Sequence, residues 1–166
     1  MTSLWLAALL ASCSAPETTD RASQKADPAA PRRLSPEAER VYQMTLERDA
    51  PPPCSQLARG LKDAPAALLE VAETVTAPPW SAVRAATCLV RHHAASVEPA
   101  LLRWVHERET MGLGLVTLNH LKHVEPALAA RLIAAARSGE YAEAAERRIA
   151  RVASAATPPG GGVLQK

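Results

Sequence analysis

Val97-Glu98-Pro99-Ala100-Leu101 returns, residue for residue, as Val124-Glu125-Pro126-Ala127-Leu128, 27 positions further along the chain. A looser copy, Ala64-Pro65-Ala66-Ala67-Leu68, precedes both. Proline is favoured in the first turn of an α-helix, where its missing N–H has no hydrogen bond to lose. Each copy therefore predicts the start of a helix, and together they divide the chain into repeating units of about 30 residues.

Further helices are predicted between and before these starts, because apolar residues recur there at helical spacing. Their predicted ranges are Cys54–Leu61, Trp80–Ala94, Met111–Lys122 and Glu140–Ala153. Another helix is predicted to begin at the Ser35 cap and to continue to about Asp49. The Met111–Lys122 segment is apolar on two sides, so we expect neighbouring helices to contact it from both.

Alternating helices in short units, each needing a neighbour to bury its apolar face, are typical of an α-solenoid. The stretch Trp80–Val90 carries Val-Arg followed by Ala and Leu, and in this the chain resembles the HEAT-repeat family over roughly residues 54–155. The resemblance implies an all-α protein, a short right-handed α-solenoid of HEAT-like helix pairs. A simple helical bundle is the alternative.

The N-terminus predicts an export signal. An apolar run over residues 4–10, too short to cross a bilayer, leads into Leu10-Ala11-Ser12-Cys13. This order of residues resembles the lipobox of bacterial lipoproteins. The resemblance implies that residues 1–12 are removed and that Cys13 carries diacylglycerol, and Ser14 resembles the sorting pattern for the outer membrane. The alternative is that Cys13 is an ordinary thiol in an apolar N-terminus.

Composition predicts where the folded part begins and ends. Residues 13–34 are rich in Ala, Pro, Ser, Thr and charge without an apolar period, and we expect a disordered tether. The folded domain is predicted over residues 35–155. Residues 156–166 are predicted to form a disordered tail, because their prolines and glycines cannot sustain a helix.

The charges argue against nucleic-acid binding. Residues 35–155 contain 14 Lys or Arg and 14 Asp or Glu, so the excess positive charge lies in the flanking segments. A nucleic-acid-binding domain needs a basic stripe on its folded part. We therefore expect no nucleic-acid partner.

With Cys13 lipidated, Cys54 and Cys88 remain as a pair in a compartment where disulfides persist. Helical spacing places Cys88 on the side of Arg84 and Arg91, away from the apolar residues Val83 and Leu89. A Cys54–Cys88 disulfide is the favoured interpretation, and two buried thiols are the alternative.

The five histidines are the remaining candidates for chemistry: His92, His93, His106, His120 and His123. His120 and His123 are three residues apart and could share a metal, with His92 or His93 as a third ligand. The alternative is that they are histidines near helix C-termini, where positive charge is favoured. We favour the second interpretation and expect no metal, no cofactor and no catalytic residues.

Trp80, Arg84 and Arg91 are the candidate contacts with a partner, although packing in the core or at a seam between units is the more common role for a residue such as Trp80. The expected function is that of a lipid-anchored, non-catalytic scaffold that binds an unknown protein of the bacterial envelope. The alternative is a HEAT-like enzyme, or a protein that handles a metal or a tetrapyrrole through His and Cys side chains, as in the HEAT-like proteins that resemble bilin lyases. The sequence leaves the oligomeric state open.

Overall fold

The computed structural model describes residues 33–47 and 50–156. All the elements in this part belong to one unit of the chain, Arg32–Lys166. They are helices, and no β-strand occurs among the described residues, which confirms the predicted all-α class. The predicted signal peptide, Cys13, all but the last two residues of the tether, and residues 157–166 of the tail lie outside the described residues.

Eight α-helices and three short 3₁₀ helices make up this described part. The α-helices are α1 Pro36–Thr45, α2 Cys54–Leu57, α3 Ala64–Thr74, α4 Pro79–His92, α5 Glu98–His106, α6 Met111–Asn119, α7 Pro126–Ser138 and α8 Ala142–Ala156. The 3₁₀ helices are η1 Ala94–Val97, η2 Arg108–Thr110 and η3 Leu121–His123. Within the helices and loops that are described, none of the segments is both long and apolar enough to cross a bilayer.

The repeated prolines lie in the first turns of helices, as predicted: Pro65 in α3, Pro99 in α5 and Pro126 in α7. Side chains just before α3 and α7 accept hydrogen bonds from the first backbone N–H groups of these two helices. The Asp63 carboxylate accepts a hydrogen bond from Ala66 N at 3.0 Å, and the Glu125 carboxylate accepts from Ala127 N and Leu128 N. Local chemistry therefore determines where these helices begin.

Other helix ends differ from prediction. The predicted helix Cys54–Leu61 stops at Leu57, and the chain turns through Gly60, whose φ of 72° favours glycine. The last helix begins at Ala142 rather than Glu140, because Glu140 bonds to the end of α5: its N–H donates to the His106 carbonyl at 2.8 Å. α1 ends at Thr45, four residues early, and the Thr45 carbonyl accepts a hydrogen bond from Arg84 of α4.

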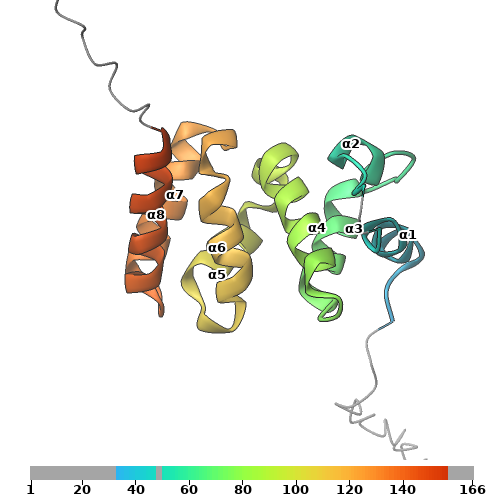
Figure 1. Cartoon of the computed structure of the whole chain (residues 1–166), viewed down its shortest axis with the longest axis horizontal. Coiled ribbons are helices and arrows are strands. Elements are labelled where there is room, and N and C mark those ends of the chain that lie inside the picture. Colours follow the sequence, from blue (N-terminus) through green and yellow to red (C-terminus); the bar gives the residue numbers. More distant parts are fainter. Residues whose placement is uncertain (1–32, 48–49, 157–166) are drawn as a thin grey trace, which may run out of the picture. The chain divides into compact units, whose positions relative to one another are not determined.

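The helices pack in pairs along the chain, and α1, α4, α5 and α6 each also contact the helix two positions further on. α3 packs on α4, α5 on α6 and α7 on α8, while α5 also contacts α7 and α1 contacts both α3 and α4. α6 contacts α4, α5 and α8, which confirms the expected contact from both sides. Figure 1 shows the helices side by side in this order from α1 to α8. The right-handed solenoid and the HEAT resemblance stay predictions.

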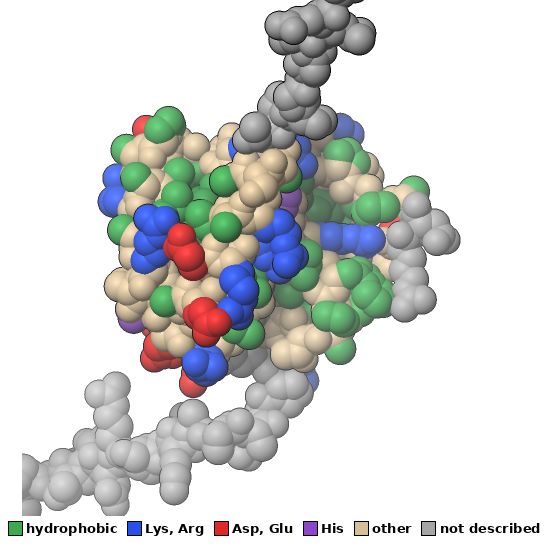
Figure 2. All heavy atoms as spheres, turned by 60° about the vertical axis from the view of Figure 1, so that its left-hand side comes forward, with side chains coloured by type: hydrophobic (Ala, Val, Ile, Leu, Met, Phe, Trp, Pro, Cys, Tyr) green, Lys and Arg blue, Asp and Glu red, His purple; other side chains and the backbone are tan. Residues whose placement is uncertain are grey.

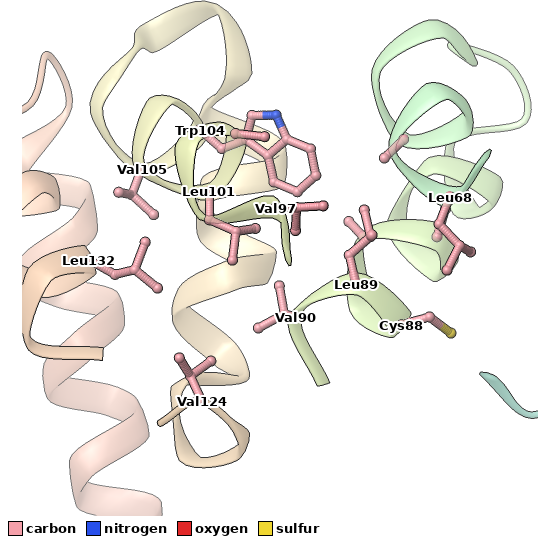
Figure 3. Close-up of a cluster of buried hydrophobic side chains, with 14 of the residues drawn as sticks. Leu68, Cys88, Leu89, Val90, Val97, Leu101, Trp104, Val105, Val124 and Leu132 are labelled. Carbon is pink, nitrogen blue, oxygen red and sulfur yellow. The ribbon is translucent and has the colours of Figure 1, made fainter. Parts of the chain in front are cut away.

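The core consists almost entirely of Ala, Leu and Val, as a chain without Phe requires. The exceptions among the buried apolar residues are Cys88, Trp104 and Tyr141. Figure 3 shows Leu89 of α4 turned toward Val97 of η1, Val90 of α4 near Leu101 of α5, and Val105 of α5 facing Leu132 of α7. Burying one such side chain contributes about 1.5–3 kcal/mol, so the contacts between successive helices hold the row together.

The backbones of α5 and α6 approach each other closely at Gly114, beside Tyr141. Tyr141, just before α8, donates its hydroxyl to the Trp104 carbonyl at 2.6 Å, and burial raises the pKa of Tyr141 to about 12. Gly114 of α6 lies against both groups, and a Cβ atom there would overlap them. Gly112, two residues earlier in α6, has open space around it.

Candidate functional site

A groove of about 450 Å³ runs along α4 and is the strongest candidate site in the described part of the chain. We call it the α4 groove. Three structures form its walls: the face of α4 from Val83 to His92, the extended segment Pro51–Pro53, and the disulfide between Cys54 and Cys88. A groove with walls of helix, proline and disulfide is held in shape without a ligand.

The sequence explains why these groups meet. Val83, Arg84, Thr87, Cys88 and Arg91 recur at helical spacing, so they form a continuous face along α4. Three consecutive prolines cannot continue a helix, and Pro53 is extended, with φ −64° and ψ 155°. This proline segment leads directly into Cys54, and the disulfide attaches it to the middle of α4.

The disulfide confirms the predicted pairing. Cys54 and Cys88 are joined by an S–S bond with their Cα atoms 5.3 Å apart. The expected placement of Cys88 away from the apolar face was wrong: Cys88 is only 4% exposed, whereas Val83, assigned to the apolar face, is 43% exposed. α4 packs against α1, α3 and α6, and these neighbours cover a side of the helix that spacing alone assigned to solvent.

The charged side chains that line the α4 groove are basic. Arg84 and Arg91 line it together with His92, and none of the described residues that line it is acidic. Arg84 Nη1 donates hydrogen bonds to the carbonyl oxygens of Thr45, at the end of α1, and of Glu47, just beyond it, whereas Arg91 and His92 are exposed. Two of the three expected partner contacts, Arg84 and Arg91, thus share one groove. Trp80 is half-buried at the start of α4 and does not line it.

Four of the five histidines lie in two pairs of sequence neighbours, and His106, at the end of α5, is in neither pair. The ring centroids of His120 and His123 are 6.0 Å apart and those of His92 and His93 are 6.5 Å apart. Partial burial and the charges of His123, Arg91 and Lys122 lower the pKa of His120. Across residues 33–47 and 50–156, His, Cys, Asp and Glu do not gather in threes as a metal site requires. The sulfur of Cys88, a possible ligand or nucleophile, is in the disulfide.

A second groove, of about 610 Å³, lies on the other side of Val83 and has mixed charge. It contains Arg103 together with Glu73, Glu107 and Glu109. Arg103 forms an ion pair with Glu73, and Glu73 also accepts a hydrogen bond from Trp104 Nε1 at 2.9 Å. We therefore take the α4 groove, with its single sign of charge, as the better candidate.

Several carboxylates have structural roles that sequence reasoning missed. Glu70 of α3 accepts a hydrogen bond from Ser35 N at 2.6 Å, and Glu37 of α1 accepts one from Lys62 N at 3.0 Å. These contacts join residues 25 to 35 positions apart, so no local sequence signal could have revealed them. They connect α1 and the residue before it, Ser35, to α3 and to Lys62 in the loop that precedes α3.

The outer surface carries charges of both signs. Arg137 pairs with Glu146 at 2.9 Å, and Arg131 with Glu98 at 2.8 Å. Figure 2 shows acidic and basic side chains interspersed on the face it presents. The α4 groove, whose described lining has one sign only, differs from this mixed surface.

No protein-family model, no curated protein and no solved structure matches this chain.

Proposed function

We propose that this protein is a lipid-anchored scaffold of the bacterial cell envelope, tethered to the outer membrane through Cys13. In this proposal it has no catalytic role and binds another envelope protein through its helical surface. The lipobox-like Leu10–Cys13 and the composition of residues 13–34 support the anchor and the tether. The Cys54–Cys88 disulfide supports export, because disulfides persist in oxidising compartments.

The observation that carries the binding role is the α4 groove. Its floor is apolar at Val83 and at the disulfide, and Arg84 and Arg91 supply charge along one side. Arginine beside apolar surface is the combination that protein interfaces favour. The disulfide and the proline segment hold the groove in shape, which lowers the entropy cost of binding.

Site-specific photo-crosslinking in living cells tests this role. A photoreactive amino acid at Val83 is expected to give a discrete crosslinked product with one envelope protein, identified by mass spectrometry. The same amino acid at Ala150, an exposed position on α8, serves as the control and is expected to give none.

The groove's charge should matter for this product. Arg91→Glu in the Val83 background is expected to reduce the crosslink by about tenfold, because it reverses a charge at the contact. Arg151→Glu makes the same change on exposed α8 and is expected to leave the yield unaltered. Equal crosslinking from Val83 and Ala150, or no discrete product from Val83, would contradict the scaffold proposal.

A further inference from the structure

The spacing of charges in the α4 groove indicates what kind of segment would fit it. Arg84 and Arg91 are seven residues apart on the same helix, which places their Cα atoms about 10 Å apart along its axis. Both line the groove, and between them lie Thr87 and the buried end of the disulfide, Cys88. A ligand that satisfies both arginines must therefore carry two anionic groups at a similar spacing, with a less polar stretch between them.

Arg84 is held by hydrogen bonds and Arg91 is exposed, but both have guanidinium N–H donors that a ligand could bind. A guanidinium has five N–H donors, and the hydrogen bonds of Arg84 to Thr45 and Glu47 use only Nη1. Both acceptors are neutral backbone carbonyls. They hold Arg84 in position, and they do not neutralise its positive charge. Arg91 is exposed at the end of α4, where His92 adds a second basic group.

We propose that the α4 groove binds a short acidic segment of the partner protein in a polyproline II conformation, with carboxylates three residues apart. In that conformation residues i and i+3 lie on the same side, about 9 Å apart, which matches the arginine spacing. The intervening prolines or small apolar residues contact Thr87 and the disulfide. Carboxylates bind arginine through paired, charge-assisted hydrogen bonds.

A peptide explains the groove better than an anionic lipid surface does. Lipid headgroups are mobile and would bind any exposed group of cations, whatever the spacing between them. The α4 groove instead holds its cations in a line, beside a wall that includes Pro51–Pro53. Two arginines at a set distance along a helix favour a peptide whose carboxylates lie at a matching distance.

This inference rests on the proposed scaffold function, and a direct binding measurement tests it separately. The full mature protein is held in non-ionic detergent and titrated against the fluorescent peptide acetyl-Gly-Glu-Pro-Pro-Glu-Pro-Gly, with anisotropy as the readout. We expect saturable binding. A peptide with both Glu replaced by Gln should bind about tenfold more weakly or worse, because it loses two charge-assisted bonds. Moving the two Glu next to each other should also weaken binding severalfold.

Protein variants locate the binding site. Arg91→Glu is expected to weaken binding by about tenfold or more, and Arg151→Glu is expected to leave it within about twofold. Equal affinity for the Glu and Gln peptides would overturn the inference, as would insensitivity to Arg91→Glu. Complete displacement of the peptide by phosphatidylglycerol added to the detergent would overturn it in favour of a lipid site. If the Val83 crosslink persists while no acidic peptide binds, the scaffold proposal survives and this inference does not.

Discussion

Gly114→Ala is expected to destabilise the protein by about 3 kcal/mol or more. The new methyl group would overlap the Tyr141 hydroxyl and the Trp104 carbonyl oxygen, which are hydrogen-bonded to each other. Relief requires α5, α6 and the start of α8 to separate at a site where Trp104 is fully buried. Forcing atoms into a packed core typically costs 1–3 kcal/mol, and here the obstacle includes backbone, which cannot rotate away. Urea unfolding followed by far-UV circular dichroism measures the change.

Gly112→Ala is the matched control. It lies two residues earlier in the same helix, and nothing is within 4 Å of the position that its Cβ would take. Alanine favours helix over glycine, so this variant is expected to be more stable than the parent by about 0.5 kcal/mol. If the two variants unfold at the same urea concentration, the close contact of Gly114 with Tyr141 and Trp104 is contradicted.

Removal of the disulfide is expected to have a comparable effect. The Cys54–Cys88 bond spans 34 positions and encloses the whole of α3, so breaking it frees a long loop in the unfolded chain. The chain-entropy relation gives a loss of about 3–4 kcal/mol for a loop of this length. Single domains have only about 5–15 kcal/mol of stability in total, so much of it depends on this bond.

The double variant Cys54→Ala/Cys88→Ala measures this effect. Alanine is chosen over serine because Cys88 is buried, and a buried hydroxyl without a partner would add its own cost. The parent protein should lose a similar amount of stability on addition of dithiothreitol, whereas the double variant should not respond to the reductant. If dithiothreitol leaves the free energy of unfolding of the parent protein unchanged, the disulfide contributes nothing to its stability.

Local patterns predicted the helices well where a helix start depends on neighbouring residues. Pro65, Pro99 and Pro126 each lie in the first turn of a helix, and a capping acid also precedes α3 and α7. Both signals act within a few residues. The predictions failed where contacts with residues distant in the sequence determine the end of a helix. Glu140 was expected to begin a helix, and it instead bonds to the end of α5, more than 30 positions earlier in the chain.

The candidate site was predictable in part. The pairing of Cys54 with Cys88 followed from the count of cysteines and the expected compartment, and Arg84 and Arg91 were grouped with Cys88 by helical spacing. What spacing could not supply was the proline segment, because only the fold brings Pro51–Pro53 against α4. Exposure was also misjudged at Val83 and Cys88, since α4 has neighbours on three sides rather than one.

The central claim is that an exported chain of packed helices is held at the envelope by a lipid on Cys13 and braced by the Cys54–Cys88 bond. Intact-mass spectrometry of the protein from membrane fractions, without reductant, tests both parts at once. The expected mass begins at Cys13, includes added acyl groups, and is lower by two hydrogens than that of the reduced chain. A mass that retains residues 1–12 and lacks acyl groups would contradict the anchor, and a mass with both thiols intact would contradict the disulfide.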